Sequence, residues 1–289
     1  MSEPDRYIAG VPCWVDTRSP DPEASVSFYR DLFGWEFEGV AGYFIARIRG
    51  EDVAAVGAQP AGGSQPAVWN TYVWVEDADE TATKVRAAGG VVQVEPYDAG
   101  EFGRMAIFAD PSGAEFRVWQ PNRQRGAAIV NEHGTLNFNN LNTRDVEGAR
   151  AFYGAVFGWE AIDVGNGYRA WALAGYGEFL DRLNPGTLEN MAAMGAPERF
   201  EDVVAALNPI PDDQPDVRPH WSVTFGVDDA DAIAARASEL GGRVMVAPFD
   251  APWVRMTVIV DPQGAMFTAS QFVPVSPDAA EGADAATGA

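Results

Sequence analysis

Residues 28–36, Phe-Tyr-Arg-Asp-Leu-Phe-Gly-Trp-Glu, return as residues 152–160, Phe-Tyr-Gly-Ala-Val-Phe-Gly-Trp-Glu. Two further pairs recur in the same order: residues 75–90 match 227–242, and the Asp-Pro-x-Gly turn at Asp110 matches the one at Asp261. With a period this long, each copy is a domain and not a unit of a solenoid. The chain is therefore a tandem duplication.

The two copies differ in length, which indicates an insertion in the second copy between Tyr168 and His220. Its apolar side chains recur at helical spacing: Phe200, Val203, Val204 and Leu207 predict a helix over 197–207, and Leu188, Met191 and Met194 predict a shorter helix before it. We expect this insertion, at about 176–217, to decorate its own domain. The alternatives are a lid over the second pocket or a dimer contact.

Composition limits the classes of protein to which the chain can belong. Its 289 residues allow two domains, each large enough for a core of its own. A net charge of −22, without a cluster of Lys and Arg, argues against nucleic acid, because that affinity comes from cations on phosphates. No stretch has the roughly 18 apolar residues of a membrane span. The single cysteine, Cys13, excludes an intrachain disulfide and favours a buried thiol in a cytoplasmic protein.

The order of the predicted elements repeats within each copy. In the first, a strand at 11–17 leads to a helix that opens near Pro22 and ends at Gly34, a left-handed cap. Further strands follow, and the β-α-β-β-β order begins again at Trp69. We therefore expect an α+β fold of four such units. The expected boundaries are a lead at 1–10, a first domain at 11–121, a linker at 122–131, a second domain at 132–273 and a disordered tail at 274–289.

The Phe-Tyr helix that ends in Phe-Gly-Trp and the Asp-Pro-x-Gly turn before the last strand resemble the vicinal-oxygen-chelate superfamily, which includes glyoxalase I, extradiol dioxygenases and bleomycin-resistance proteins. The resemblance covers about residues 8–273. It implies that two units form one curved mixed sheet whose concave face holds a ligand. The chain should then have two such faces, called here the first cup and the second cup.

Metal enzymes of that family carry histidine near the start of the first strands and a carboxylate after the Asp-Pro-x-Gly turn. The matching positions are Trp14, Asn70 and Arg117 in the first domain and Asn137, Ser222 and Thr268 in the second. None of these side chains is a good ligand for a divalent metal, so we expect no metal cofactor. The alternative is a divalent metal that uses the only two histidines, His133 and His220.

Alternation along the strands predicts what the second cup presents. Ser222 and Thr224 share one face of their strand, and apolar Val223 lies on the other. The candidate ligand-binding residues of this cup are all neutral and polar: Asn137, Asn139, Ser222, Thr224, Thr268 and Ser270. The alternative is a small polar face that is merely open to solvent.

The first cup is expected to be aromatic. Its candidate ligand-binding residues are Trp14, Asn70, Tyr72, Trp74, Arg117 and Trp119. Such a wall suits a flat aromatic or anionic small molecule, held by stacking and by a charge-assisted hydrogen bond. The alternative is that these aromatic side chains fill the cup as core, with Arg117 paired to an acid.

These patterns favour a metal-independent small-molecule binding protein of the bleomycin-resistance type, with the first cup as the better site. No catalytic residue can be assigned, since the sequence has neither a phosphate-binding loop nor a Gly-x-Ser-x-Gly elbow. One alternative is a glyoxalase-like lyase, isomerase or hydroxylase that uses a histidine with a metal or as an acid or base. The other is a non-catalytic protein that assembles, for instance as a homodimer, through Phe200, Val203 and Leu207.

Overall fold

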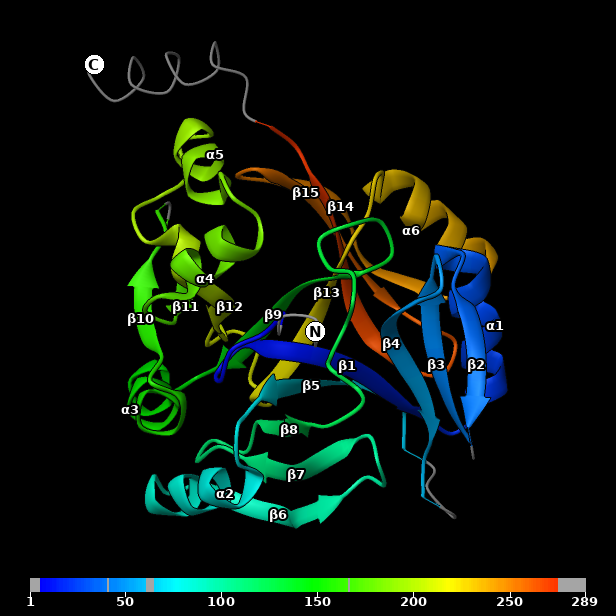
Figure 1. The fold of residues 1–289 in the computed structure, drawn as a ribbon. Helices are drawn as coiled ribbons and strands as arrows, with labels where there is room; N and C mark the ends of the chain where they lie inside the picture. Colours follow the sequence, from blue (N-terminus) through cyan, green and yellow to red (C-terminus); the bar gives the residue numbers. More distant parts are fainter. Residues whose placement is uncertain (1–5, 41, 61–64, 166, 275–289) are drawn as a thin grey trace, which may run out of the picture.

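The computed structural model describes residues 6–40, 42–60, 65–165 and 167–274, which form two eight-stranded sheets (Figure 1). The strands of the first sheet are β1 (Pro12–Ser19), β2 (Glu36–Val40), β3 (Tyr43–Ile48), β4 (Glu51–Ala58), β5 (Val68–Trp74), β6 (Val91–Asp98), β7 (Gly103–Ala109) and β8 (Glu115–Pro121). Those of the second are β9 (Leu136–Thr143), β10 (Glu160–Asp163), β11 (Arg169–Ala172), β12 (Val203–Pro209), β13 (His220–Gly226), β14 (Arg243–Ala251), β15 (Val254–Val260) and β16 (Met266–Phe272). The predicted tail lies outside the described residues, apart from Pro274.

Both sheets are mixed and have the same strand order. The first runs β2-β3-β4-β1-β5-β8-β7-β6, and the second runs β10-β11-β12-β9-β13-β16-β15-β14. At the centre of each sheet the first strands of two units pair antiparallel, β1 with β5 and β9 with β13. Each of these strands has a parallel neighbour on its other side. The predicted α+β fold, with two tandem domains built from β-α-β-β-β units, is confirmed.

Each unit has one helix after its first strand. These helices are α1 (Pro22–Phe33), α2 (Ala78–Ala87), α3 (Val146–Phe157) and α6 (Ala230–Glu239). Helix α1 begins where Asp21 accepts a hydrogen bond from the backbone N–H of Ala24, with Pro22 in the first turn. It ends at Gly34, whose φ of 71° is left-handed, a conformation that glycine adopts without strain.

The repeated tyrosines dock the two copies onto each other. Tyr29 donates a hydrogen bond to Oδ2 of Asp261 at 2.9 Å, and Tyr153 donates one to Oδ2 of Asp110 at 3.1 Å. Each aspartate opens the Asp-Pro-x-Gly turn of the other copy. The two motifs that reveal the duplication are thus partners across the interface between the copies.

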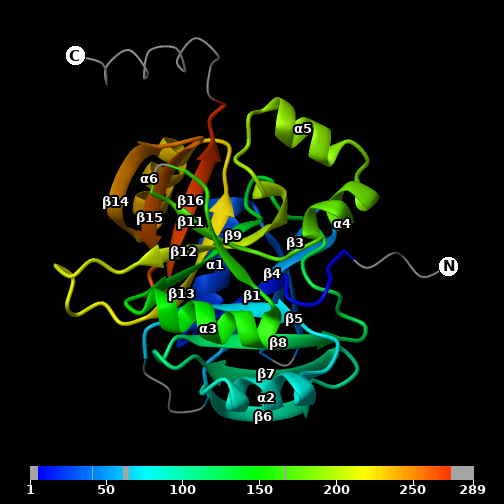
Figure 2. The ribbon, with the colours of Figure 1, turned by 90° about the vertical axis from the view of Figure 1, so that its left-hand side faces the viewer.

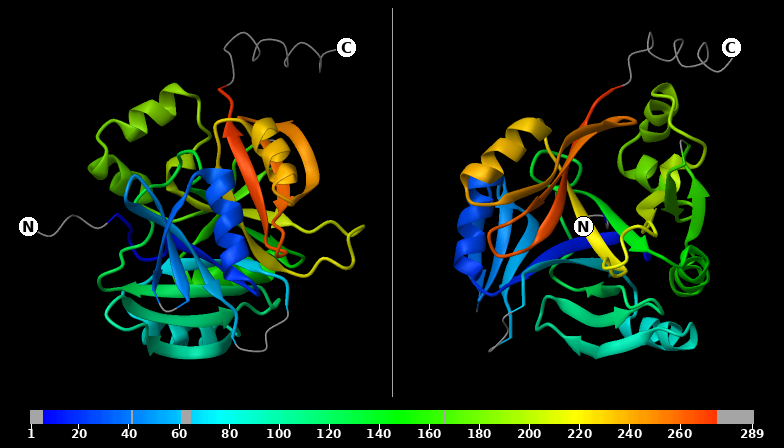
Figure 3. Two further views of the ribbon diagram at one scale, coloured as in Figure 1. Left: turned by 90° about the vertical axis from the view of Figure 1, so that its right-hand side faces the viewer. Right: turned by 180° about the vertical axis from the view of Figure 1, so that it is seen from behind.

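The repeated tryptophans also bond across that interface. Trp35 donates to the carbonyl of Gly134 at 2.7 Å, and Trp159 donates to the carbonyl of Gly10 at 2.8 Å. Helix α1 accordingly lies beside α6, and α2 lies beside α3 (Figures 1 and 3). The first unit therefore packs on the fourth, and the second unit packs on the third.

Two hydrophobic cores result from this packing, and both copies contribute to each. One core combines Val15 and Tyr29 with Phe225 and Phe267, none of them more than 1% exposed. The other combines side chains of β8 and α2 with those of α3 and β12. Neither of these two cores belongs to one copy alone, because the helix and the outer face of each sheet bury their apolar side chains against the other copy.

The insertion lies between β11 and β12 and starts with α4 (Tyr176–Leu183) and α5 (Thr187–Ala193), which stand together at one end of the molecule (Figure 2). The shorter predicted helix corresponds to α5. The helix predicted over 197–207 is wrong, because only the 3-10 turn η1 (Phe200–Asp202) precedes strand β12. Ala205 and Leu207 alternate into the core, which is the period of a strand. The helical face suggested for a homodimer is thus absent from the described residues, and the homodimer stays a prediction.

Cys13 lies on β1 and is fully buried. Burial raises the pKa of its thiol, so the residue packs as a small hydrophobe. None of the helices in the described part of the chain is long and apolar enough to cross a membrane.

Buried tyrosines should make the fold sensitive to alkali. Burial raises the pKa of six phenols above the ordinary value of 10.0: Tyr7, Tyr29, Tyr43, Tyr72, Tyr153 and Tyr176. Their stabilising contribution is complete below the unfolded pKa and falls above it, by about 1.4 kcal/mol per pH unit for each tyrosine. We expect phenolate absorbance to rise together with loss of circular dichroism above pH 10.0. Ionisation of these phenols in a protein that stays folded would contradict this prediction.

Candidate functional site

The six candidate residues of the first domain lie on one face of the first sheet. The registers of β1, β5 and β8 bring them side by side, and none is more than 8% exposed: Trp14, Asn70, Tyr72, Trp74, Arg117 and Trp119. The aromatic members belong to a third core, together with Met105 and Tyr7. The structure therefore favours the alternative reading, in which these side chains fill the first cup. Ligand binding by them stays a prediction.

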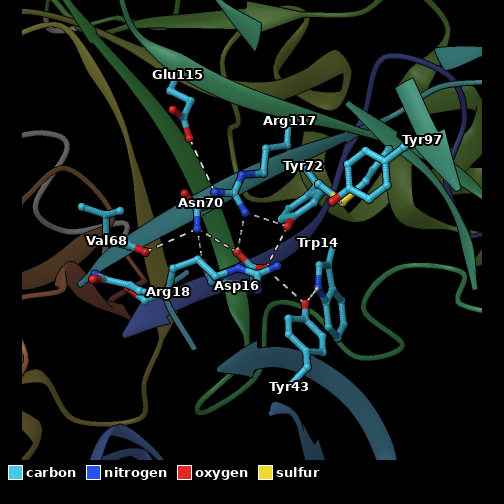
Figure 4. A network of polar contacts seen from close by, with 12 residues as sticks. Trp14, Asp16, Arg18, Tyr43, Val68, Asn70, Tyr72, Tyr97, Glu115 and Arg117 are labelled. Atoms are coloured by element: carbon cyan, nitrogen blue, oxygen red, sulfur yellow. Dashed lines mark hydrogen bonds and ion pairs between the residues drawn. The ribbon is translucent and has the colours of Figure 1, made fainter. Parts of the chain in front are cut away.

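Arg117 is paired to an acid, as that alternative requires, and the acid is Asp16 (Figure 4). The Asp16 carboxylate is fully buried and accepts hydrogen bonds from Asn70 Nδ2 at 2.8 Å, from the Tyr72 hydroxyl at 2.8 Å and from Arg117 Nη1 at 3.2 Å. The Tyr43 hydroxyl donates to it at 3.2 Å. A charge this deeply buried is tolerable only because these donors surround it.

The charge of Arg117 is stabilised by the same groups. Burial opposes that charge, but Tyr72 and Asp16 outweigh burial and raise the pKa of the guanidinium. Glu115, at 3.5 Å, is a second and more exposed partner. Arg18 Nη2 lies 3.3 Å from Asp16, and the Arg18 side chain is 33% exposed. The first cup is thus a closed polar network set among aromatic rings.

The sequence prediction omitted Asp16, Arg18 and Tyr43. The available signal was the alternation of β1, since Asp16 and Arg18 follow Trp14 at intervals of two and share its face. Alternation places the Asp16 carboxylate on the same face as Trp14, and a carboxylate that is buried there needs a charged or hydrogen-bonding partner.

The second cup has the same scaffold but much smaller side chains. Tyr72 pairs with Arg117 in the first sheet, and Thr224 pairs with Thr268 at the same place in the second. Two residues further along these strands, Gly226 and Ser270 of the second sheet stand where the first sheet has Trp74 and Trp119. Four large side chains in the first sheet thus correspond to four small ones in the second.

Neutral hydrogen-bonding groups line the second cup. Asn140, which occupies the place of Asp16, donates to Thr224 Oγ1 at 3.0 Å, and Asn142 donates to Ser222 Oγ at 3.0 Å. Asn140, Asn142, Ser222 and Thr268 are partly exposed, so a ligand can reach them. The register continues this face with apolar side chains on the outer strands β14 and β15 and at the end of β16: Val246, Met256, Val258 and Phe272.

Two predicted residues of this cup need separate comment. Asn139 does not line it, because Asn139 is 3% exposed on the opposite face and accepts a hydrogen bond from Thr71 of the first sheet at 2.7 Å. The register shifts at this point, where β9 pairs Phe138 and Leu136 with successive residues of β13 and leaves Asn137 as an extra residue. Simple alternation from Asn137 therefore assigned Asn139 to the wrong face.

A recess of about 290 Å³ continues the second cup at one end. Ser270, Phe272, Val254, Asn137 and His133 contribute to its wall. His133 Nδ1 accepts a hydrogen bond from the backbone N–H of Asp228 at 3.1 Å, which leaves the proton of a neutral ring on Nε2.

The two histidines cannot share one metal. His220 begins β13, whereas His133 lies beside the other end, where Gly134 donates to the carbonyl of Gly226. At about 3.3 Å per residue, roughly 20 Å separates the two ends of that strand. Within the described ranges, no three His, Cys, Asp or Glu side chains gather as metal ligands. In the first cup a guanidinium occupies the place beside the carboxylate, and the second cup offers neutral amides and hydroxyls, so neither donor set fits a divalent metal.

Comparison with known proteins agrees with this architecture. The sequence profile of the Glyoxalase/Bleomycin resistance protein/Dioxygenase superfamily matches residues 14–118 and 135–268. Putative glyoxylase CFP32 of Mycobacterium tuberculosis is 38% identical over 287 residues, which cover 95% of this chain and 99% of that protein. Anthracycline biosynthesis protein DauV of Streptomyces sp. (strain C5) is 36% identical over 296 residues, which cover 96% and 99%.

Solved structures with the same fold share far less sequence. The Mn(II)-bound glyoxalase from Novosphingobium aromaticivorans has a TM-score of 0.60 at 17% identity and covers 94% of this chain and 86% of its own. The 2,3-dioxygenase LapB from Pseudomonas sp. KL28 has a TM-score of 0.60 at 14% identity, with coverage of 94% and 96%. At such identities the likeness concerns the fold alone.

Proposed function

Because the chain belongs to the Glyoxalase/Bleomycin resistance protein/Dioxygenase superfamily, we propose that it is a metal-independent cytoplasmic protein that binds a small molecule in its second cup. The contrast between the cups carries this proposal. On one scaffold, four large side chains fill the first cup, whereas the second cup carries small residues at the same places and has partly exposed polar side chains at Asn140, Ser222 and Thr268.

The lining suggests the chemistry of the ligand. Amides and hydroxyls on the central strands match hydroxyl and carbonyl groups, while Met256 and Val258 on β15 and Phe272 at the end of β16 match an apolar ring edge. A flat, oxygenated polycyclic compound has both properties. The 36% and 35% identity to two anthracycline biosynthesis proteins supports this class of compound.

Filling the second cup should abolish binding. The probe is 1,8-dihydroxyanthraquinone, and its affinity is measured by isothermal titration calorimetry. We expect Thr224→Trp to weaken binding about 100-fold or more, because the indole occupies the hollow. The matched control is Thr83→Trp on the exposed side of α2, which should bind as the unaltered protein does. Equal affinity in both variants would reject the second cup as the site, and an unaltered protein that ignores the probe would reject the ligand class.

Metal analysis tests the proposal that the protein is metal-independent. We expect untagged protein to contain far less than one equivalent of zinc, iron, nickel or manganese, because both cups lack a suitable donor set. Mass spectrometry of metals after dialysis against each ion measures this content. One tightly held ion per chain, lost on substitution of His133 or His220, would instead support the histidine-centred enzyme.

A further inference from the structure

A cavity of about 790 Å³ lies at the edge of the first domain, separate from the second cup. The ends of β5 and β8 form its floor through Trp74 and Gln120, and the N-terminal segment adds Tyr7. This volume is within the range of pockets that hold small ligands.

The cavity is the counterpart of the second-cup recess. Trp74 and Gln120 correspond by register to Gly226 and Gln271, which line that recess, and Tyr7 corresponds to Asn131 at the offset of the first repeat. The fold therefore opens a hollow at this place in both domains. The two hollows differ in their walls, because the first domain supplies aromatic rings where the second supplies glycine and asparagine.

The second domain contributes part of the wall of this cavity. Helix α4 of the insertion lies next to the N-terminal segment (Figure 2) and adds Phe179 and Arg182 to the wall. Its position is fixed because Tyr176 packs onto the core of the first cup and Gly177 donates a hydrogen bond to Asp202 Oδ1 at 3.0 Å. The insertion thus contributes to a cavity of the first domain. Helix α4 does not lie over the second cup, where one of the alternatives placed a lid.

The wall combines aromatic rings with cations. Tyr7 stacks on Trp74 at 5.8 Å between ring centroids, and Phe179 is 9% exposed. The guanidinium of Arg125 lies 5.8 Å from the Trp74 centroid, and that of Arg182 lies 5.9 Å from the Phe179 centroid. Glu76 is the acidic residue of this lining, beside two arginines. In a chain of net charge −22, two arginines at the wall of one cavity are distinctive.

We propose that this cavity is a second ligand site, specific for a small aromatic anion such as an aryl carboxylate or sulfonate. The rings contact the aromatic part, and Arg125 of the linker and Arg182 of the insertion bind the acid group. The site is independent of the one proposed in the second cup, since the two hollows share no lining residue.

Calorimetric titration with 2-naphthalenesulfonate tests the site, with uncharged 2-naphthalenemethanol as the matched probe. We expect the sulfonate to bind, and Arg125→Gln and Arg182→Gln each to weaken it about tenfold, the effect of losing one charge-assisted hydrogen bond. The uncharged probe should bind more weakly and respond to neither substitution. Arg243→Gln, at an exposed position on β14, is the control and should leave binding of the sulfonate unchanged.

Three results would overturn the proposal. They are an unaltered protein that does not bind the sulfonate, affinities that are the same with and without the two arginines, and loss of sulfonate binding in Thr224→Trp, which would place the anion in the second cup. Retention of sulfonate binding in Thr224→Trp, together with loss of dihydroxyanthraquinone binding, would support both sites separately. Both arginine side chains are exposed. We therefore expect the two variants to unfold at the same temperature as the unaltered protein, and a thermal melt checks that they are folded.

Discussion

Cutting the chain between Val130 and Asn131 should give two fragments that do not fold alone but assemble when mixed. Two of the three hydrophobic cores need both copies, as the contacts of Tyr29 with Phe267 and of Phe116 with Tyr153 illustrate. A buried side chain of this size contributes about 1.5–3 kcal/mol, and separation would expose many of them at once. That loss exceeds the usual net stability of a domain, about 5–15 kcal/mol.

The cut itself should be harmless, because it falls at an exposed residue between the sheets. The control is the intact chain with a flexible Gly/Ser segment inserted at the same place, which should fold as before. Circular dichroism and gel filtration of each fragment, and of the mixture, give the answer. A cooperative thermal transition in residues 1–130 alone would show that the first copy holds a sufficient core, contrary to this prediction.

The fold could be predicted because its signals are local and are repeated. The Phe-Tyr stretch, the Gly34 cap and the Asp-Pro-x-Gly turn each fix a short segment, and duplication confirms every segment a second time. The docking of the copies could not be predicted in the same way. Nothing local to Tyr29 says that its hydroxyl donates to Asp261, more than two hundred residues away.

The candidate site was predicted where alternation holds and missed where it fails. Ser222 and Thr224 do share the face of the second cup, because β13 is regular there. The extra residue at Asn137 reversed the assignment of Asn139, and a bulge has no clear signature in a single sequence. Residue type alone also could not show which cup is the better ligand site, since aromatic side chains suit a ligand wall and a packed interior equally well.

Replacement of Asp16 by Ala should cost about 3–5 kcal/mol of folding free energy, the largest loss that we expect from a single substitution in this chain. Asp16 is fully buried and holds Arg117, Asn70 and Tyr72 together. Its removal leaves a buried guanidinium with Glu115, which is 45% exposed, as its remaining acidic partner. Urea unfolding measures the loss.

Two comparisons separate the effect of the unpaired Arg117 charge from other effects of the Asp16 substitution. In the double variant Asp16→Ala, Arg117→Met the buried cation is gone, so we expect a substantial part of the lost stability to return. Asp52→Ala breaks a surface ion pair with Arg47, in which both side chains are about one-third exposed, and should cost less than about 1 kcal/mol.

The outcome decides between the two interpretations of the first cup. A large loss with recovery in the double variant means that the network is structural, because a filled interior cannot hydrate the orphaned guanidinium. If Asp16→Ala unfolds at nearly the same urea concentration as the unaltered protein, water must reach Arg117, and a cup open to water could admit an anionic ligand. In that case the Arg117 cup, and not the hollow beside Thr224, would be the place to search first for the ligand.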